Sequence, residues 1–148
     1  AVPEWNGMGT TCVACLIRNG LVHTVNVGDS RAYLVTHEIR QITKDHSMVM
    51  NLYERGDITK EELKNHPKRN VITRAVGVAE NVEPDYFENE LPQGGAVILC
   101  TDGLSNYCDE GVMFRMTKDL SPEELPKALV KNALDNGSGD NITAAVMK

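Results

Sequence analysis

The sequence lacks several features that would place it in a common class of proteins. No apolar run approaches the roughly 18 residues that a membrane-spanning helix needs, and the N-terminus does not have the layout of a signal peptide. We therefore expect a cytoplasmic protein with no membrane insertion. Positive charge is not in excess either, because 15 Lys and Arg face 21 Asp and Glu, for a formal net charge of −6. Since nucleic-acid binders normally carry a basic patch, this balance argues against a nucleic-acid partner.

The chain has four cysteines, and their spacing does not support a metal or redox site. Cys12 and Cys15 have C-x-x-C spacing, but seven residues rather than two separate Cys100 from Cys108, so a four-thiolate zinc site is poorly supported. Cys12 and Cys15 also fall in a predicted strand, where positions i and i+3 point to opposite faces. We predict that all four are reduced and mostly buried thiols.

An apolar stretch followed by an Asp-Gly pair organises the chain. Residues 96–100 are five consecutive apolar residues, which is typical of a strand that is buried on both faces. The run ends at Asp102-Gly103, where an ionised carboxylate needs a partner. Two interpretations are open: Asp102 closes the strand as a turn residue or helix N-cap, or it ligates a metal ion from a position that the sheet fixes.

The first third of the chain predicts antiparallel strands without a helix. Residues 10–17 and 21–27 are apolar and β-branched, and they flank an Asn19-Gly20 turn signal, which predicts a hairpin. With two further strands, this part is predicted to form a meander. All the further predicted strands lie at residues 31–35, 39–43, 84–91, 96–101 and 142–147.

Helical spacing and capping signals predict helices between the later strands. The first covers residues 48–53 and is capped by Ser47 or Asp45, and a second, short helix follows a capping box at Thr59. A third covers residues 112–116, and a fourth runs from Ser121-Pro122 to a closing Gly137. Residues 45–77 form a long insertion between strands. It is predicted to be either a mobile flap or an ordinary helical connection.

Three aspartates fall beside glycine at predicted strand ends or tight turns: Asp29, Asp102 and Asp140. Glycine lets the backbone bend so that a carboxylate and nearby carbonyl groups can converge on one point. Hard divalent cations such as Mg²⁺ and Mn²⁺ prefer oxygen ligands of this kind. Hydrophobic periodicity does not show whether the three meet, so one shared metal site and separate turns are both open.

Six short motifs stand in a fixed order along nearly the whole chain. They are Gly9-Thr10-Thr11, Val27-Gly28-Asp29-Ser30-Arg31-Ala32-Tyr33, Asp45-His46-Ser47, Ile72-Thr73-Arg74-Ala75-Val76-Gly77, Cys100-Thr101-Asp102-Gly103-Leu104 and Gly139-Asp140-Asn141-Ile142-Thr143. No single motif is specific, but together and in this order they resemble the type 2C (metal-dependent, PPM-type) serine/threonine protein phosphatases. The chain is similar to the bacterial kind, which opposes a membrane Ser/Thr kinase.

The resemblance implies a fold and a set of metal ligands. The fold would be α+β, an α-β-β-α sandwich of antiparallel sheets flanked by helices, with residues 1–148 as a single partial catalytic domain. Matched by motif, Asp102 and Asp140 would be ligands of a two-metal centre that holds Mn²⁺ or Mg²⁺. Asp29 would help to hold a third, weaker metal. Residues 45–77 would be the family's flap beside the active site.

The resemblance also implies a reaction and its partners. The reaction would be hydrolysis of phosphoserine and phosphothreonine in phosphorylated proteins, including a Ser/Thr kinase, by a metal-activated water. No side chain would be the nucleophile, so the absence of a convincing Cys-His or Ser-His arrangement does not argue against it. The histidines are predicted to be structural or exposed; they are His23, His37, His46 and His66.

The sequence departs from the family pattern at its N-terminal end. Upstream of the Gly-Thr-Thr strand, family members carry an Arg that grips phosphate and an Asp-Gly pair followed by Gly-His. This sequence begins just before Gly9, and Asn6-Gly7 offers no carboxylate. We therefore expect a fold that is incomplete at the N-terminus, weak or no activity for this chain alone, and homodimerisation through exposed edges. A non-catalytic, phosphatase-like binding or regulatory module and a structural domain whose acidic turns bind nothing are the open alternatives.

Overall fold

The computed structural model describes residues 3–148, which form two antiparallel sheets and a set of helices. The strands are β1 (Cys12–Arg18), β2 (Leu21–Val27), β3 (Arg31–Val35), β4 (Ile39–Gln41), β5 (Asp85–Glu90), β6 (Ala96–Cys100) and β7 (Ala144–Met147). The helices are the 3₁₀ turn η1 (Pro3–Trp5), α1 (Met48–Glu54), α2 (Lys60–Asn65), α3 (Asp102–Ser105), α4 (Glu110–Asp119) and α5 (Leu125–Asp135).

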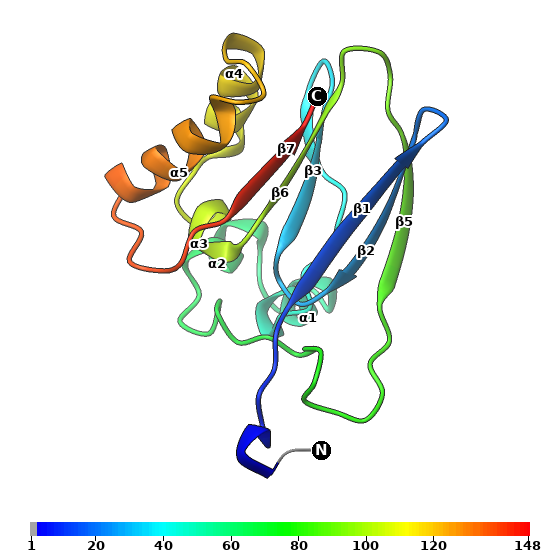
Figure 1. The fold of residues 1–148 in the computed structure, drawn as a ribbon. Coiled ribbons are helices and arrows are strands. Elements are labelled where there is room, and N and C mark those ends of the chain that lie inside the picture. The colour runs from blue at the N-terminus through cyan, green and yellow to red at the C-terminus, as the bar shows by residue number, and fades with distance from the viewer. Residues whose placement is uncertain (1–2) are drawn as a thin grey trace.

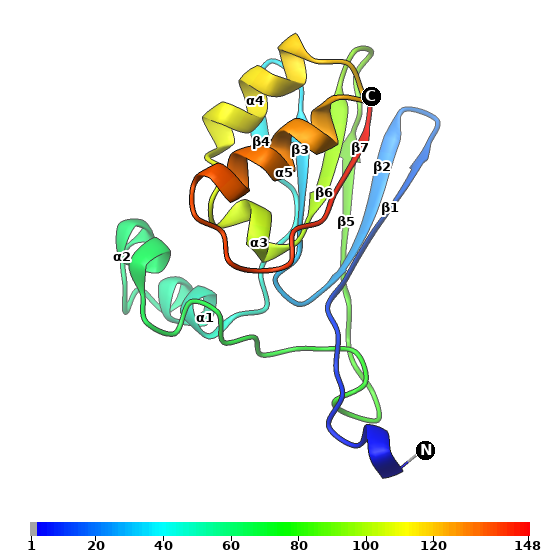
Figure 2. The same ribbon diagram turned by 60° about the vertical axis from the view of Figure 1, so that its left-hand side comes forward.

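The elements stack in layers (Figures 1 and 2). One sheet has the order β1-β2-β5 and the other the order β4-β3-β6-β7. Helices α4 and α5 cover the four-stranded sheet on the side away from the three-stranded sheet, and α1 and α2 lie apart from them near one end of the molecule. The predicted α+β class with two antiparallel sheets and flanking helices is confirmed.

The predicted hairpin forms, and its turn explains why. Asn19 and Gly20 have φ values of 53° and 75°, the left-handed conformations of a two-residue type I′ turn. This turn has the twist of the flanking strands, so β1 pairs with β2 along their whole length, from Cys12 opposite Val27 to Arg18 opposite Leu21.

The predicted four-stranded meander is wrong, because β2 and β3 belong to different sheets. Gly28 follows β2 with a φ of 108°, and a β-carbon there would lie only 2.4 Å from Cγ2 of Thr11. The chain therefore turns sharply at residues 28–30 and crosses to the other sheet. Strand β2 then pairs with β5, and β3 pairs with β6. Alternation of apolar residues marks a strand but does not say which sheet it joins.

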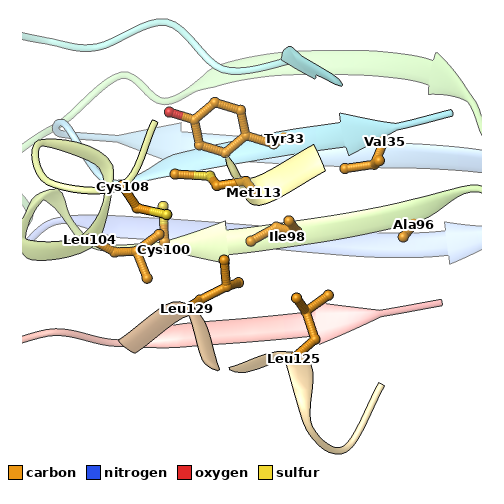
Figure 3. Packing of buried hydrophobic residues seen from close by; sticks show 10 residues of the cluster. All are labelled: Tyr33, Val35, Ala96, Ile98, Cys100, Leu104, Cys108, Met113, Leu125 and Leu129. Carbon is orange, nitrogen blue, oxygen red and sulfur yellow. The ribbon is translucent and has the colours of Figure 1, made fainter. Parts of the chain in front are cut away.

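Strands β3 and β6 are buried on both faces because each contributes to two hydrophobic clusters. On the helix side, residues of these strands pack against the helices and the chain between them, as Figure 3 shows. The buried members of this cluster are Tyr33, Val35, Ala96, Ile98, Cys100, Leu104, Cys108, Met113, Leu125 and Leu129. On the opposite face, Ala32, Leu34 and Val97 pack against the three-stranded sheet. The prediction of a doubly buried strand before Asp102 is confirmed.

The outer face of the three-stranded sheet is exposed in the part of the chain that the structure describes. Leu16 of β1 is 61% exposed and Tyr86 of β5 is 74% exposed. No described helix covers this face (Figure 2). In the same residues, no helix is long and apolar enough to cross a membrane.

Two helix starts refine the sequence predictions. Ser47, not Asp45, caps α1, because its side chain accepts the backbone N–H of Met50 at 3.2 Å. Helix α5 begins at Leu125 rather than at residue 122. The predicted capping box does form, since Ser121 Oγ accepts the N–H of Glu124, but it closes a turn that precedes the helix.

The insertion at residues 45–77 is tied to the rest of the fold at its base. After α1 and α2, residues 71–76 return as extended chain between two neighbours. Thr10 exchanges two backbone hydrogen bonds with Val76, of 3.0 and 2.8 Å. On the other side, Thr73 donates its N–H to the carbonyl of His46 at 2.8 Å.

Candidate metal-binding site

Asp102 opens the short helix α3 directly after the buried strand β6. Thr101, and not Asp102, holds the N-cap position, so the N-cap interpretation of Asp102 is wrong. Because β6 is fixed between two hydrophobic clusters, it sets the position of the residue that follows it. The carboxylate of Asp102 therefore emerges at a rigid strand end, the kind of position that a functional site requires.

The loop that carries Asp140 lies directly against α3. A β-carbon on Gly103 would meet the carbonyl oxygen of Asn141 at 2.4 Å and the β-carbon of Asp140 at 3.4 Å. Only glycine permits this approach, so Gly103 brings the backbone of residues 140–141 beside that of residues 102–103.

Hydrogen bonds hold the two segments together. Thr101 Oγ1 donates to the carbonyl of Asn141 at 3.3 Å and accepts the N–H of Thr143 at 3.0 Å. Buried Ser138 donates its hydroxyl to the carbonyl of Gly103 at 2.8 Å. Asp102 and Asp140, predicted from separate motifs, are thus neighbours in the fold.

Asp29 lies in the turn at residues 28–30 and is electrostatically close to Asp102. Burial, helped by the negative charges of Asp102 and Asp45 and opposed by its own backbone N–H and Arg31, raises the pKa of the Asp29 carboxyl to about 6. Like charges that share a half-buried site disfavour each other's ionised form. A bound cation would remove this penalty.

Asp45 is paired already and is not a free ligand. Arg31 Nε contacts both carboxylate oxygens of Asp45 at 3.0 Å, and Nη2 contacts Oδ2 at 2.6 Å. Gln41 donates a further hydrogen bond to Oδ1 at 2.8 Å. Burial alone would lower the pKa of Arg31, but these contacts with Asp45 and the nearby Tyr33 raise it overall. Such an Arg–carboxylate fork satisfies both buried charges.

The described residues do not complete a metal centre by themselves. Within residues 3–148, no group of three or more His, Cys, Asp or Glu side chains is arranged so that it could hold a metal ion. The structure brings Asp140 next to Asp102 and places Asp29 within the electrostatic reach of Asp102. It does not gather the three carboxylates into one cluster.

The cysteines behave largely as predicted. All four are free thiols, and burial raises the pKa of Cys100 to about 12 and that of Cys108 to about 11. Thiols with such high pKa values are poor nucleophiles at neutral pH. The prediction that they are mostly buried holds for this pair and not for Cys12, which is exposed.

Sequence reasoning missed an ionic cluster beside the Asp29 turn. Asp85 of β5 contacts Nε2 of His46 at 3.1 Å and Nη1 of Arg74 at 2.7 Å. Burial raises the pKa of Asp85, but its hydrogen bonds with His46 and Arg74 outweigh this and lower it. The motifs around His46 and Arg74 were visible in the sequence. Their convergence with Asp85 was not, because it depends on how β5 pairs with β2.

Comparison with known proteins defines the class. The chain matches the family described as Protein phosphatase 2C over residues 4–142. It belongs to this family. Its relatives are named serine/threonine phosphatases, so the family is one of enzymes.

Individual relatives agree with this placement. The serine/threonine phosphatase stp of Listeria monocytogenes is 40% identical over 98% of this chain. The crystal structure of Stp1 from Staphylococcus aureus is 42% identical over 97% of the chain, with a TM-score of 0.90. The catalytic domain of PstP, solved in complex with two manganese ions, is 34% identical over 99% of the chain, with a TM-score of 0.85. The chain spans 58% of the Listeria protein, 57% of the Stp1 chain and 63% of the PstP chain.

Proposed function

We propose that this chain supplies part of a two-metal centre for hydrolysis of phosphoserine and phosphothreonine in proteins. The observation that carries the proposal is the contact at Gly103, which places the Asp140 loop against the start of α3. This contact supports the proposal because it brings the segments that carry Asp102 and Asp140, which are distant in the sequence, next to each other.

The residues present fit Mn²⁺ or Mg²⁺. The candidate ligands are carboxylates, and hard divalent cations prefer oxygen donors. Burial first, and then the negative charges of Asp102 and Asp45, raise the pKa of Asp29, and a bound cation would favour its ionised form. We assign Asp102 and Asp140 as ligands of the metal pair and Asp29 as a ligand of a third, weaker site. The PstP structure with two manganese ions supports this metal requirement for the family.

The chemistry divides between the metal and the protein. When bound, a pair of divalent cations lowers the pKa of a water and offsets charge on the phosphoryl oxygens. The part of this chain is to hold Asp102 and Asp140 at fixed positions, through β6, Gly103 and Thr101. No side chain is proposed as a nucleophile.

The substrates are proposed to be phosphorylated proteins, including a Ser/Thr kinase. The names of the relatives support a protein substrate, and the resemblance to bacterial phosphatases that oppose a kinase supports the kinase. We further propose that this chain alone turns over little substrate. No described group of three metal-binding side chains is in place, so two carboxylates would hold the metals weakly.

The test is phosphate release from a phosphothreonine peptide, with and without Mn²⁺. Three chains are compared: the unchanged protein, Asp102→Asn, and Asp57→Asn as a control at an exposed carboxylate. We expect release near the uncatalysed background for all three. Mn²⁺ should nevertheless promote binding of the peptide to the unchanged and control chains, and not to Asp102→Asn.

Each other result has a definite meaning. Mn²⁺-dependent hydrolysis that Asp102→Asn abolishes would support the site and refute the low turnover. Hydrolysis or peptide binding that is unchanged in Asp102→Asn would refute the proposed metal site. Mn²⁺-independent binding of the peptide would favour a non-catalytic phosphoprotein-binding module instead.

A further inference from the structure

His46 joins three separate parts of the chain from a buried position. Its side chain is only 3% exposed. Its backbone N–H donates to the carbonyl of Gly28 at 2.9 Å, and its ring Nδ1 accepts the N–H of Gly28 at 3.1 Å. Its carbonyl accepts the N–H of Thr73, and its Nε2 contacts Asp85. One residue thus links the Asp29 turn, the return segment at residues 71–76 and strand β5.

The contacts fix where the ring proton lies. Because Nδ1 accepts the N–H of Gly28, the proton of the neutral ring belongs on Nε2, which then donates to Asp85 at 3.1 Å. Arg74 Nη1 lies 3.2 Å from Nε2, but both atoms are donors, and both are directed to the carboxylate of Asp85. Asp85 therefore holds the imidazole in the form that can accept from Gly28.

The turn at residues 28–30 needs support from this side. Gly28 has a φ of 108° and is pressed against Thr11, so its conformation is open only to glycine. Thr11 holds the far side of the turn through a 2.9 Å hydrogen bond between its hydroxyl and that of Ser30. The paired hydrogen bonds of His46 hold the near side, immediately before Asp29.

We propose that His46 is a positioning residue that fixes the turn carrying Asp29, and that Asp85 and Arg74 keep its ring in the accepting orientation. The proposal rests on the proposed function for the role of Asp29 as a metal ligand. Its geometric part, the control of the Gly28 turn by the ring, stands separately.

Two substitutions separate the two ring nitrogens. In His46→Asn, the amide oxygen takes the place of Nδ1 and can still accept from Gly28, but the contact to Asp85 is lost. In His46→Gln, the amide nitrogen takes the place of Nε2 and keeps the contact to Asp85, but the acceptor for Gly28 is lost. A residue with a merely structural role would be damaged in a similar way by both changes.

The experiment is amide hydrogen exchange by NMR on the metal-free chain, followed by Mn²⁺ titration. We expect His46→Gln to exchange the Gly28 amide about tenfold faster, as expected for a lost hydrogen bond, while the buried Val97 amide of β6 is unchanged. His46→Asn should restore slow exchange. Mn²⁺ affinity should fall about tenfold in His46→Gln, the scale of lost support for a metal ligand, and much less in His46→Asn.

Other outcomes are decisive as well. Equal exchange at Gly28 in both variants and the unchanged chain would overturn the proposal. If both variants lose protection at Val97, they have unfolded. The test is then the NMR coupling through the hydrogen bond between Gly28 N and His46 Nδ1 in the unchanged chain. The presence of this coupling supports the proposal and its absence overturns it. If the unchanged chain binds no Mn²⁺, the proposed function fails. The exchange data still test whether His46 fixes the turn at Gly28.

Discussion

At the scale of single residues, the site is defined by charges that the protein does not fully compensate. Asp45 has Arg31 and Gln41 as partners, and Asp85 has His46 and Arg74. Asp29 has no such pairing to lower its pKa, and burial together with Asp102 raises that pKa to about 6. When Asp29 is ionised beside Asp102, its charge destabilises the metal-free fold. A bound cation would offset this charge.

We predict that Asp29→Asn stabilises the metal-free protein at pH 7. The pKa of Asp29 is raised from 3.8 to about 6, so the folded state holds a proton that the unfolded state releases. Stability therefore falls as pH rises from about 4 to about 6, and the loss is fully present above pH 6. Solvent screening reduces the gain from substitution to on the order of 1 kcal/mol.

Thermal unfolding with EDTA at several pH values measures this effect. The Tm of Asp29→Asn should exceed that of the unchanged chain at pH 7, and the two should converge near pH 4. Asp57→Asn, at an exposed position, should show no such pH-dependent difference. A difference in Tm that is the same at pH 4 and pH 7 would contradict the account.

At the scale of elements, the critical contact is between α3 and the loop at residues 138–141. Hydrogen bonds from Ser138 to Gly103 and from Thr101, the N-cap of α3, to Asn141 hold them together, and Gly103 is the most constrained part. A methyl group at Gly103 has no room, because the nearest atom is a backbone carbonyl rather than a flexible side chain.

Gly103→Ala is predicted to destabilise the protein by about 1–3 kcal/mol, the usual cost of forcing atoms into a packed site. Helix propensity alone predicts the opposite effect on stability, because it favours alanine over glycine by about 1 kcal/mol. Gly139→Ala is the matched control, since a β-carbon there meets no atom within 4 Å. Urea denaturation measures both; equal stability of the two variants would refute the contact, and Mn²⁺ affinity should fall only for Gly103→Ala.

Elements that depend on local signals could be predicted from the sequence. Asn19-Gly20 specifies its hairpin turn, and Ser47 and Thr59 cap α1 and α2 through their own side chains. The crossing from β2 to β3 could not, because the apolar residues of β3 predict a strand without indicating which sheet it joins. The start of α5 was placed too early, because the capping box at Ser121 closes a separate turn before the helix.

At the scale of the whole molecule, the sequence predicted the candidate ligands but not their arrangement. Asp29, Asp102 and Asp140 could each be found from an adjacent glycine at a strand end. Their proximity comes from the pairing of β3 with β6 and of β6 with β7, which joins parts of the chain that lie far apart in the sequence. The spacing of residues in the sequence does not indicate which strands pair with each other. Self-association through the exposed β1-β2-β5 sheet and a cytoplasmic location stay predictions.

The most direct test of the account is a calorimetric titration of the full 148-residue chain with Mn²⁺, beside Asp102→Asn and Asp140→Asn. Asp57→Asn serves as the control for loss of a surface charge. The account predicts that the unchanged and control chains bind Mn²⁺ and that each of the two site substitutions abolishes binding. Binding that survives either site substitution, or no binding by the unchanged chain, would contradict the claim that Asp102 and Asp140 form one metal site.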